Sequence, residues 1–124
     1  MTAFGLLSVF LVGGCSKAPE ASAPRSEAVE ESAAQAGEAI FQTRCFVCHG
    51  REGKGNGPAS TGLGATVRDL TSPSWQNSIS DETIHSVIQN GAQAVGGSTA
   101  MPPNRDLSDV QIQSLVRYIR GLGK

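Results

Sequence analysis

The spacing of apolar and polar positions predicts two helices in the second half of the chain. One covers 80–90, where Ser80 can cap the first turn and a glycine follows the last. The other covers 108–122, where Ser108 and Gln111 have the spacing of a capping box. The apolar stripe of this second helix consists of Ile112, Leu115, Val116, Ile119 and Leu122.

An earlier helix leads into a pair of cysteines. Ser32 and Gln35 have capping-box spacing, and small or apolar residues follow at three- and four-residue steps. Long loops rich in Gly and Pro, 50–78 and 91–106, separate the helices, and strand patterning is absent. The fold class is therefore predicted to be all-α. Because such loops far exceed the usual ~4–6 residues, we expect them to wrap a bound group.

Composition agrees with a bound group. The chain has 124 residues, the length of one ordinary domain, of which 39% are hydrophobic and 5% aromatic. So short a chain buries a small fraction of its surface, and this one has little material for a side-chain core. Its formal charge of −1 lacks the basic excess of a nucleic-acid-binding protein, so we expect no nucleic-acid partner.

The first residues are typical of an export signal. Residues 2–14 are uncharged and mostly apolar, too short for a membrane span, and end at Cys15. Val12-Gly13-Gly14-Cys15 resembles a bacterial lipobox, although no Lys or Arg precedes the apolar run. We expect residues 1–14 to be a signal peptide and Cys15 to carry lipid, which places the protein on the periplasmic side of a bacterial membrane. The alternative is a short buried segment with a free thiol.

Two further stretches complete the predicted organisation. Residues 15–35 are rich in Ala, Ser, Pro and Glu and contain little apolar surface, so they are predicted to form a flexible tether. Residues 36–124 are the remaining candidate for a folded domain.

The strongest chemical signal is Cys45-Phe46-Val47-Cys48-His49, the C-x-x-C-H pattern of covalent haem attachment. Two cysteines three residues apart on a helical turn can each bond one vinyl group along a porphyrin edge, and the next histidine then lies under the iron. A thioredoxin-like redox pair would need a βαβ context, and a zinc site would need further ligands besides His85. A disulfide across one helical turn would be strained.

The motifs together resemble a class I, monohaem cytochrome c over residues 36–124. The residues that carry the resemblance are Gly37, Ile40, Phe41, Cys45, Cys48, His49 and Gly50, then Gly57-Pro58, Met101-Pro102-Pro103 and Tyr118 in the closing helix. With the lipobox, the whole chain resembles a bacterial lipoprotein cytochrome. The resemblance implies a cytochrome c-like fold and one haem c bound through Cys45 and Cys48.

The resemblance also implies roles around the haem. Met101 matches the sixth iron ligand, a thioether that raises the potential relative to a second histidine, and His49 is the fifth. Pro58 matches the residue whose carbonyl accepts a hydrogen bond from the other nitrogen of that histidine. Arg68 and Trp75 resemble residues that donate to the haem propionates, but a solvated Arg and a half-buried Trp are equally compatible with the sequence.

Two more features have structural interpretations. Gly37 and Tyr118 match the crossing of the first and last helices, where the absence of a side chain permits a close approach. The glycines at 53, 55 and 57 are expected to let the backbone approach the porphyrin.

The leading functional hypothesis is a monomeric, non-enzymatic electron carrier with both axial positions filled. Its partners would be redox proteins such as a membrane oxidase or reductase, and its lipid would hold it at the membrane. A gas sensor or peroxidase-like enzyme with a labile sixth site is one alternative, and an accessory subunit of a membrane oxidase or reductase is another. His85 is the rival to Met101 as sixth ligand.

Overall fold

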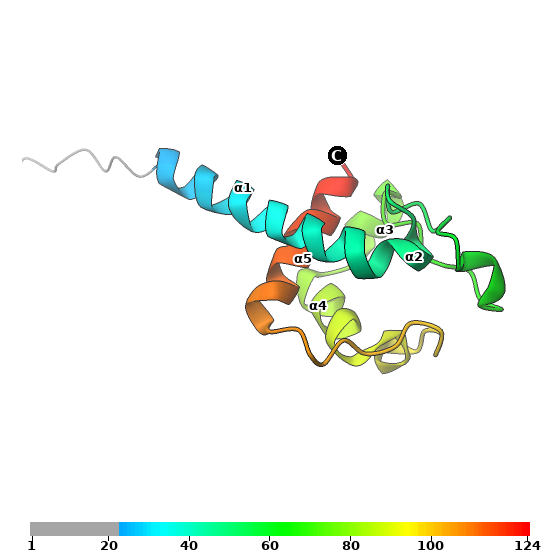
Figure 1. Cartoon of the computed structure of the whole chain (residues 1–124). Coiled ribbons are helices and arrows are strands. Elements are labelled where there is room, and N and C mark those ends of the chain that lie inside the picture. Colours follow the sequence, from blue (N-terminus) through cyan, green and yellow to red (C-terminus); the bar gives the residue numbers. More distant parts are fainter. Residues whose placement is uncertain (1–22) are drawn as a thin grey trace, which may run out of the picture.

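Helices α1 and α5 cross each other, and α4 packs against α5 (Figure 1). The structure, a computed structural model, describes residues 23–124. These residues contain helices and turns and no strand, so the all-α prediction is confirmed. The helices are α1 (Ala23–Ile40), α2 (Phe46–His49), α3 (Pro73–Ser78), α4 (Asp81–Asn90) and α5 (Asp109–Leu122), with a π-helical turn over Phe41–Cys45 and 3₁₀ turns over Ser60–Gly62 and Ala92–Val95.

Helices α4 and α5 form as the sequence predicts, because their caps are encoded locally. The Ser80 hydroxyl accepts a hydrogen bond from the Thr83 N–H at 3.2 Å. Ser108 and Gln111 make both bonds of the capping box, at 2.9 and 3.3 Å. Within residues 23–124, no helix is both long and apolar enough to cross a membrane.

Helix α1 departs from the prediction at its start. The sequence predicts a beginning at Ser32 and a flexible tether up to residue 35, but the described part of that stretch, 23–35, is helical. The physical reason is its content of Ala and Glu, which have high helix propensities. The predicted signal peptide, Cys15 and the first part of the tether lie outside the described residues.

Helix α3 lies inside a segment predicted to be a loop, 50–78. It begins with Pro73 after Ser72, a position where proline suits the first helical turn. Arg120 of α5 holds this helix in place by donating to the carbonyl oxygens of Gln76 at 2.7 Å and Ile79 at 2.6 Å. The contact depends on tertiary structure and has no local sequence signature.

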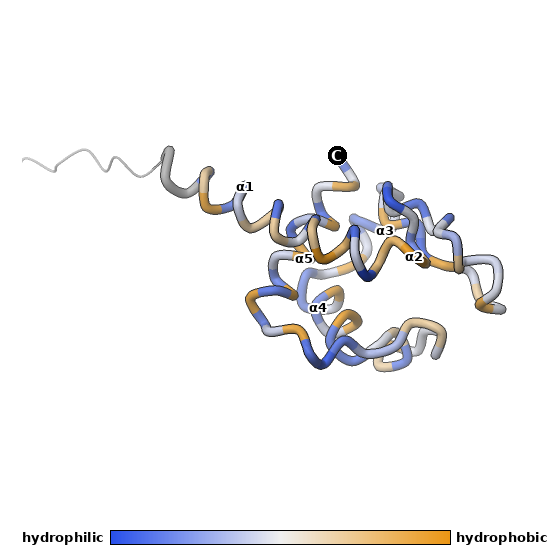
Figure 2. Tube along the Cα trace, in the orientation of Figure 1, coloured by the Kyte–Doolittle hydropathy of each residue, from blue (hydrophilic) through white to orange (hydrophobic). Residues whose placement is uncertain are grey.

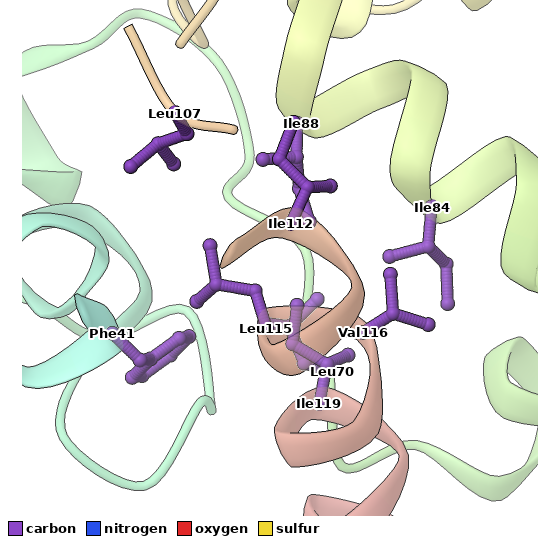
Figure 3. Packing of buried hydrophobic residues seen from close by; sticks show 9 residues of the cluster. All are labelled: Phe41, Leu70, Ile84, Ile88, Leu107, Ile112, Leu115, Val116 and Ile119. Carbon is purple, nitrogen blue, oxygen red and sulfur yellow. The ribbon is translucent and has the colours of Figure 1, made fainter. Parts of the chain in front are cut away.

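The core lies between α5 and its neighbours. Figure 3 shows Ile112 near Ile88 and Val116 near Ile84, which joins α4 to α5, whereas Leu115 lies on the side of Phe41. In Figure 2, apolar segments recur along α4, α5 and the stretch from the end of α1 into α2. The buried apolar residues are Phe41, Leu70, Ile84, Ile88, Leu107, Ile112, Leu115, Val116 and Ile119.

A glycine at the helix crossing sets the distance between α1 and α5. A Cβ atom on Gly37 would lie 2.0 Å from the Ser114 carbonyl oxygen, so a larger residue cannot be accommodated without separating the helices. Next to it, the rings of Phe41 and Tyr118 pack at a centroid distance of 5.2 Å, tilted by 51°. The structure therefore confirms the predicted roles of Gly37 and Tyr118.

We predict that Gly37→Ala destabilises the holoprotein by roughly 1–3 kcal/mol, because the added methyl group overlaps the α5 backbone. Gly121→Ala is the matched control, since it also lies in a helix and its Cβ would meet no atom within 4 Å. The control is expected to be neutral or to stabilise by up to about 1 kcal/mol. Denaturant unfolding measures both variants, and equal midpoints would contradict the role of the crossing.

Candidate haem site

The two motif cysteines and the histidine lie on one short helical segment. A π-helical turn, Phe41–Cys45, connects α1 to α2, and the Phe46 N–H bonds to the Phe41 carbonyl oxygen. The sequence pattern predicts ordinary helical spacing here and gives no sign of this wider turn. Such turns insert an extra residue and redirect the face of the helix that follows. Phe41 is thereby fully buried while Cys45 and Cys48 stay partly accessible.

The loop after α2 folds back and satisfies the carbonyl groups at the end of that helix. The N–H groups of Gly55, Gly57 and Ala59 donate to His49, Cys48 and Val47 oxygens at 2.7, 3.0 and 2.8 Å. A Cβ on Gly57 would lie 2.4 Å from the Val47 oxygen. This glycine is needed for the approach of loop to helix, a role that differs from the predicted approach to porphyrin.

His49 has the protonation state that an iron ligand requires. Its Nδ1 lies 3.3 Å from the carbonyl oxygen of Arg68, so Nδ1 carries the hydrogen and Nε2 retains its lone pair. Burial lowers the pKa of the imidazole, and the Arg68 carbonyl opposes that shift only in part. The neutral ring is therefore the form present at neutral pH.

The carbonyl group next to His49 Nδ1 in the structure is not the one that the sequence resemblance implies. The sequence resemblance assigns this hydrogen bond to the Pro58 carbonyl, but the structure gives it to Arg68. Pro58 instead lies between Gly57 and Ala59, whose N–H groups bind α2. The backbone of Arg68, reached through the long loop, could not be placed there from the sequence. Its side chain is exposed.

The two thiols of the motif are free of a disulfide. Burial raises the pKa of Cys45 to about 11, against a smaller opposing effect of the neighbouring Arg44. Cys45 is therefore a neutral thiol at neutral pH, which makes it a poor nucleophile for disulfide exchange. Its side chain packs against the hydrophobic core.

Met101 lies in the second long loop and is half-buried against the core. Its carbonyl oxygen accepts a hydrogen bond from the Ala92 N–H at 3.2 Å. Trp75, on α3, is also half-buried against the core. His85 lies on α4, where its Nε2 is 3.8 Å from Asp109 Oδ1 at the start of α5. Haem-binding roles for Met101, Pro58, Arg68 and Trp75 stay predictions.

Both long loops lack a core of their own side chains. Between residues 50 and 69 the buried positions are the glycines Gly50, Gly53 and Gly57, and residues 92–106 include no buried position. Loops of this length need something to pack against. A neutral imidazole, two free thiols and two loops without side-chain cores fit a covalently attached haem.

The comparisons with known proteins agree with this site. Residues 32–119 match the family model described as cytochrome C oxidase, cbb3-type, subunit III. The chain belongs to this family of c-type cytochromes. Among solved structures, it is similar to the KustC0563 c-type cytochrome, with 30% identity and a TM-score of 0.58 over 71% of this chain and 98% of that one. A comparison with curated protein sequences gave no match.

The family establishes this protein as a monohaem class I cytochrome c with haem c bound covalently through Cys45 and Cys48. The haem supplies an iron that can change between two oxidation states. The chain holds the two cysteines on one turn and keeps His49 neutral and oriented. Two loops surround the site. The backbone of the first donates hydrogen bonds to α2, and the backbone of the second donates one to α4.

We predict that a Cys45→Ala/Cys48→Ala variant, which cannot attach haem, is largely unfolded. The reason is that the two long loops bury almost no side chains of their own. Circular dichroism of the variant beside the wild-type holoprotein measures helix content and thermal unfolding. Native helix content with a cooperative transition would contradict the idea that haem completes the core.

Proposed function

We propose that this cytochrome carries single electrons with its iron ligated by His49 and Met101, while a lipid on Cys15 holds it at the periplasmic side of a bacterial membrane. Electron carriage is the usual role of proteins of this family. A ligand on each axial position leaves no place for a substrate, so the protein would transfer electrons without forming or breaking bonds.

One observation carries the choice of Met101 as the sixth ligand. The carbonyl group of Met101 accepts a hydrogen bond from Ala92 in the 3₁₀ turn that follows α4, and its side chain is half-buried against the core. Gly91 permits this approach, since a Cβ there would lie 2.9 Å from the Met101 oxygen and its φ is 83°. Pro102 and Pro103 restrict the backbone that follows. His85 faces Asp109 instead, which makes it the weaker candidate.

The Met101→Ala variant tests the ligation. We expect it to lose the weak ferric absorption band of the iron–sulfur bond and to have a lower reduction potential, because a thioether favours ferrous iron. His85→Ala is the control and should keep both properties. The opposite result, loss of six-coordination in His85→Ala with Met101→Ala unchanged, would establish bis-histidine ligation and contradict the proposal.

A second candidate function follows from the family name. The matching model describes a subunit of a cbb3-type oxidase, so this cytochrome could instead be a permanently docked electron-entry subunit of a membrane oxidase. The two functions differ in what holds the protein at the membrane. A carrier depends on its lipid, whereas a subunit is also held by its partner proteins.

Cys15→Ser distinguishes these functions and tests the anchor. If the protein is a lipid-anchored carrier, the variant, which lacks the lipid, should move from the membrane fraction to the soluble periplasmic fraction and keep its haem spectrum. Cell fractionation with detection of haem makes the measurement, and mass spectrometry checks that the signal peptide is cleaved. A cleaved variant that stays on membranes and elutes in detergent as a large complex would favour the oxidase subunit.

A further inference from the structure

The Met101 loop, residues 98–107, is attached at two places, to the 3₁₀ turn Ala92–Val95 and to α4. One is the bond between Met101 and the Ala92 N–H at 3.2 Å. The other is Asn104, whose main-chain N–H and side-chain Nδ2 both donate to the Ile88 oxygen, at 3.0 and 3.1 Å. Neither α4 nor the 3₁₀ turn carries a cysteine, so these bonds do not reach the haem-attachment segment, residues 44–49. Apart from the ion pair described next, the loop is linked to that segment through the shared core, in which Leu107 is buried and against which Cys45 packs.

An ion pair makes the connection to the haem-attachment segment. Arg44 Nη2 lies 2.6 Å from Asp106 Oδ2. Arg44 directly precedes Cys45, which packs against the core, and Asp106 directly precedes the buried Leu107. Each partner is therefore next to a residue that packs in the core, and the pair adds a direct polar contact between the Met101 loop and the haem-attachment segment.

Both side chains of this pair are charged at neutral pH. The hydrogen bond from Arg44 lowers the pKa of the Asp106 carboxyl group below its ordinary value. The two side chains are 46% and 62% exposed. An ion pair with that exposure changes an equilibrium constant by up to about fivefold. The corresponding free energy is small compared with the free energy of global unfolding, but it is significant for a local equilibrium such as the opening of one loop.

We propose that the Arg44–Asp106 pair is a clamp that keeps the Met101 loop closed and thereby keeps the methionine sulfur on the iron. Arg44 and Asp106 are then positioning residues that set how readily another ligand replaces Met101. The inference rests on the proposed ligation of the iron by Met101. A molecule that competes for the sixth position reports on loop opening directly.

Cyanide titration of the ferric holoprotein tests the clamp. Asp106→Asn and Arg44→Gln should each raise cyanide affinity about two- to fivefold, because less free energy opposes loop opening. The double variant should gain no more than either single one, since both changes remove the same contact. Arg44→Lys keeps the charge and should lie between Arg44→Gln and the wild type.

Glu52→Gln is the matched control. It breaks the Lys54–Glu52 pair, which has a similar distance of 2.7 Å and similar exposure, within a loop that does not contain Met101. Cyanide affinity of this variant should equal that of the wild type. The midpoint of global unfolding should change equally little in Asp106→Asn and in Glu52→Gln.

Met101→Ala separates a failure of the clamp from a failure of the proposed ligation. If Met101→Ala binds cyanide no more tightly than the wild type, the methionine is not the ligand and the proposed function is wrong. If that variant binds cyanide much more tightly but Asp106→Asn behaves like Glu52→Gln, the clamp is wrong. Additive effects of Arg44→Gln and Asp106→Asn on cyanide affinity would also contradict the clamp. So would a loss in the free energy of global unfolding as large as the gain in the free energy of cyanide binding.

Discussion

The contact between Gly37 and the Ser114 carbonyl group is the constraint on which the haem site depends. It brings α1 against α5 and fixes Phe41 in the core, one π-helical turn before the first cysteine. The direction of α2, and with it the position of Cys45, Cys48 and His49, follows from that anchored turn. A side chain at position 37 would therefore disturb the site as well as the packing.

The helices and the loops contribute differently to the site. Helices α1, α4 and α5 supply the side-chain core, whereas residues 50–69 and 92–106 bury no side chain larger than that of glycine. The loop carbonyl of Arg68 fixes the tautomer of His49, and the end of α4 holds the Met101 segment. Such loops need a bound group to pack against, and a covalent attachment keeps that group in place even when the protein opens.

The features that sequence predicts correctly are encoded within a few residues. The caps at Ser80 and Ser108 and the apolar stripe of α5 are local, and C-x-x-C-H is a contiguous motif. The missed features involve distant partners. The Arg68 carbonyl reaches His49 across a loop, and α3 is held by Arg120 of the last helix. Neither contact has a fixed spacing, so no pattern could reveal it.

The most direct test of the account is the optical spectrum of the reduced wild-type holoprotein before and after addition of carbon monoxide. Carbon monoxide binds ferrous haem when the sixth position is open. If His49 and Met101 fill both positions, the spectrum should stay unchanged. Rapid conversion to a carbon monoxide complex would show an open sixth site, and a sensor or enzyme would then replace the electron carrier.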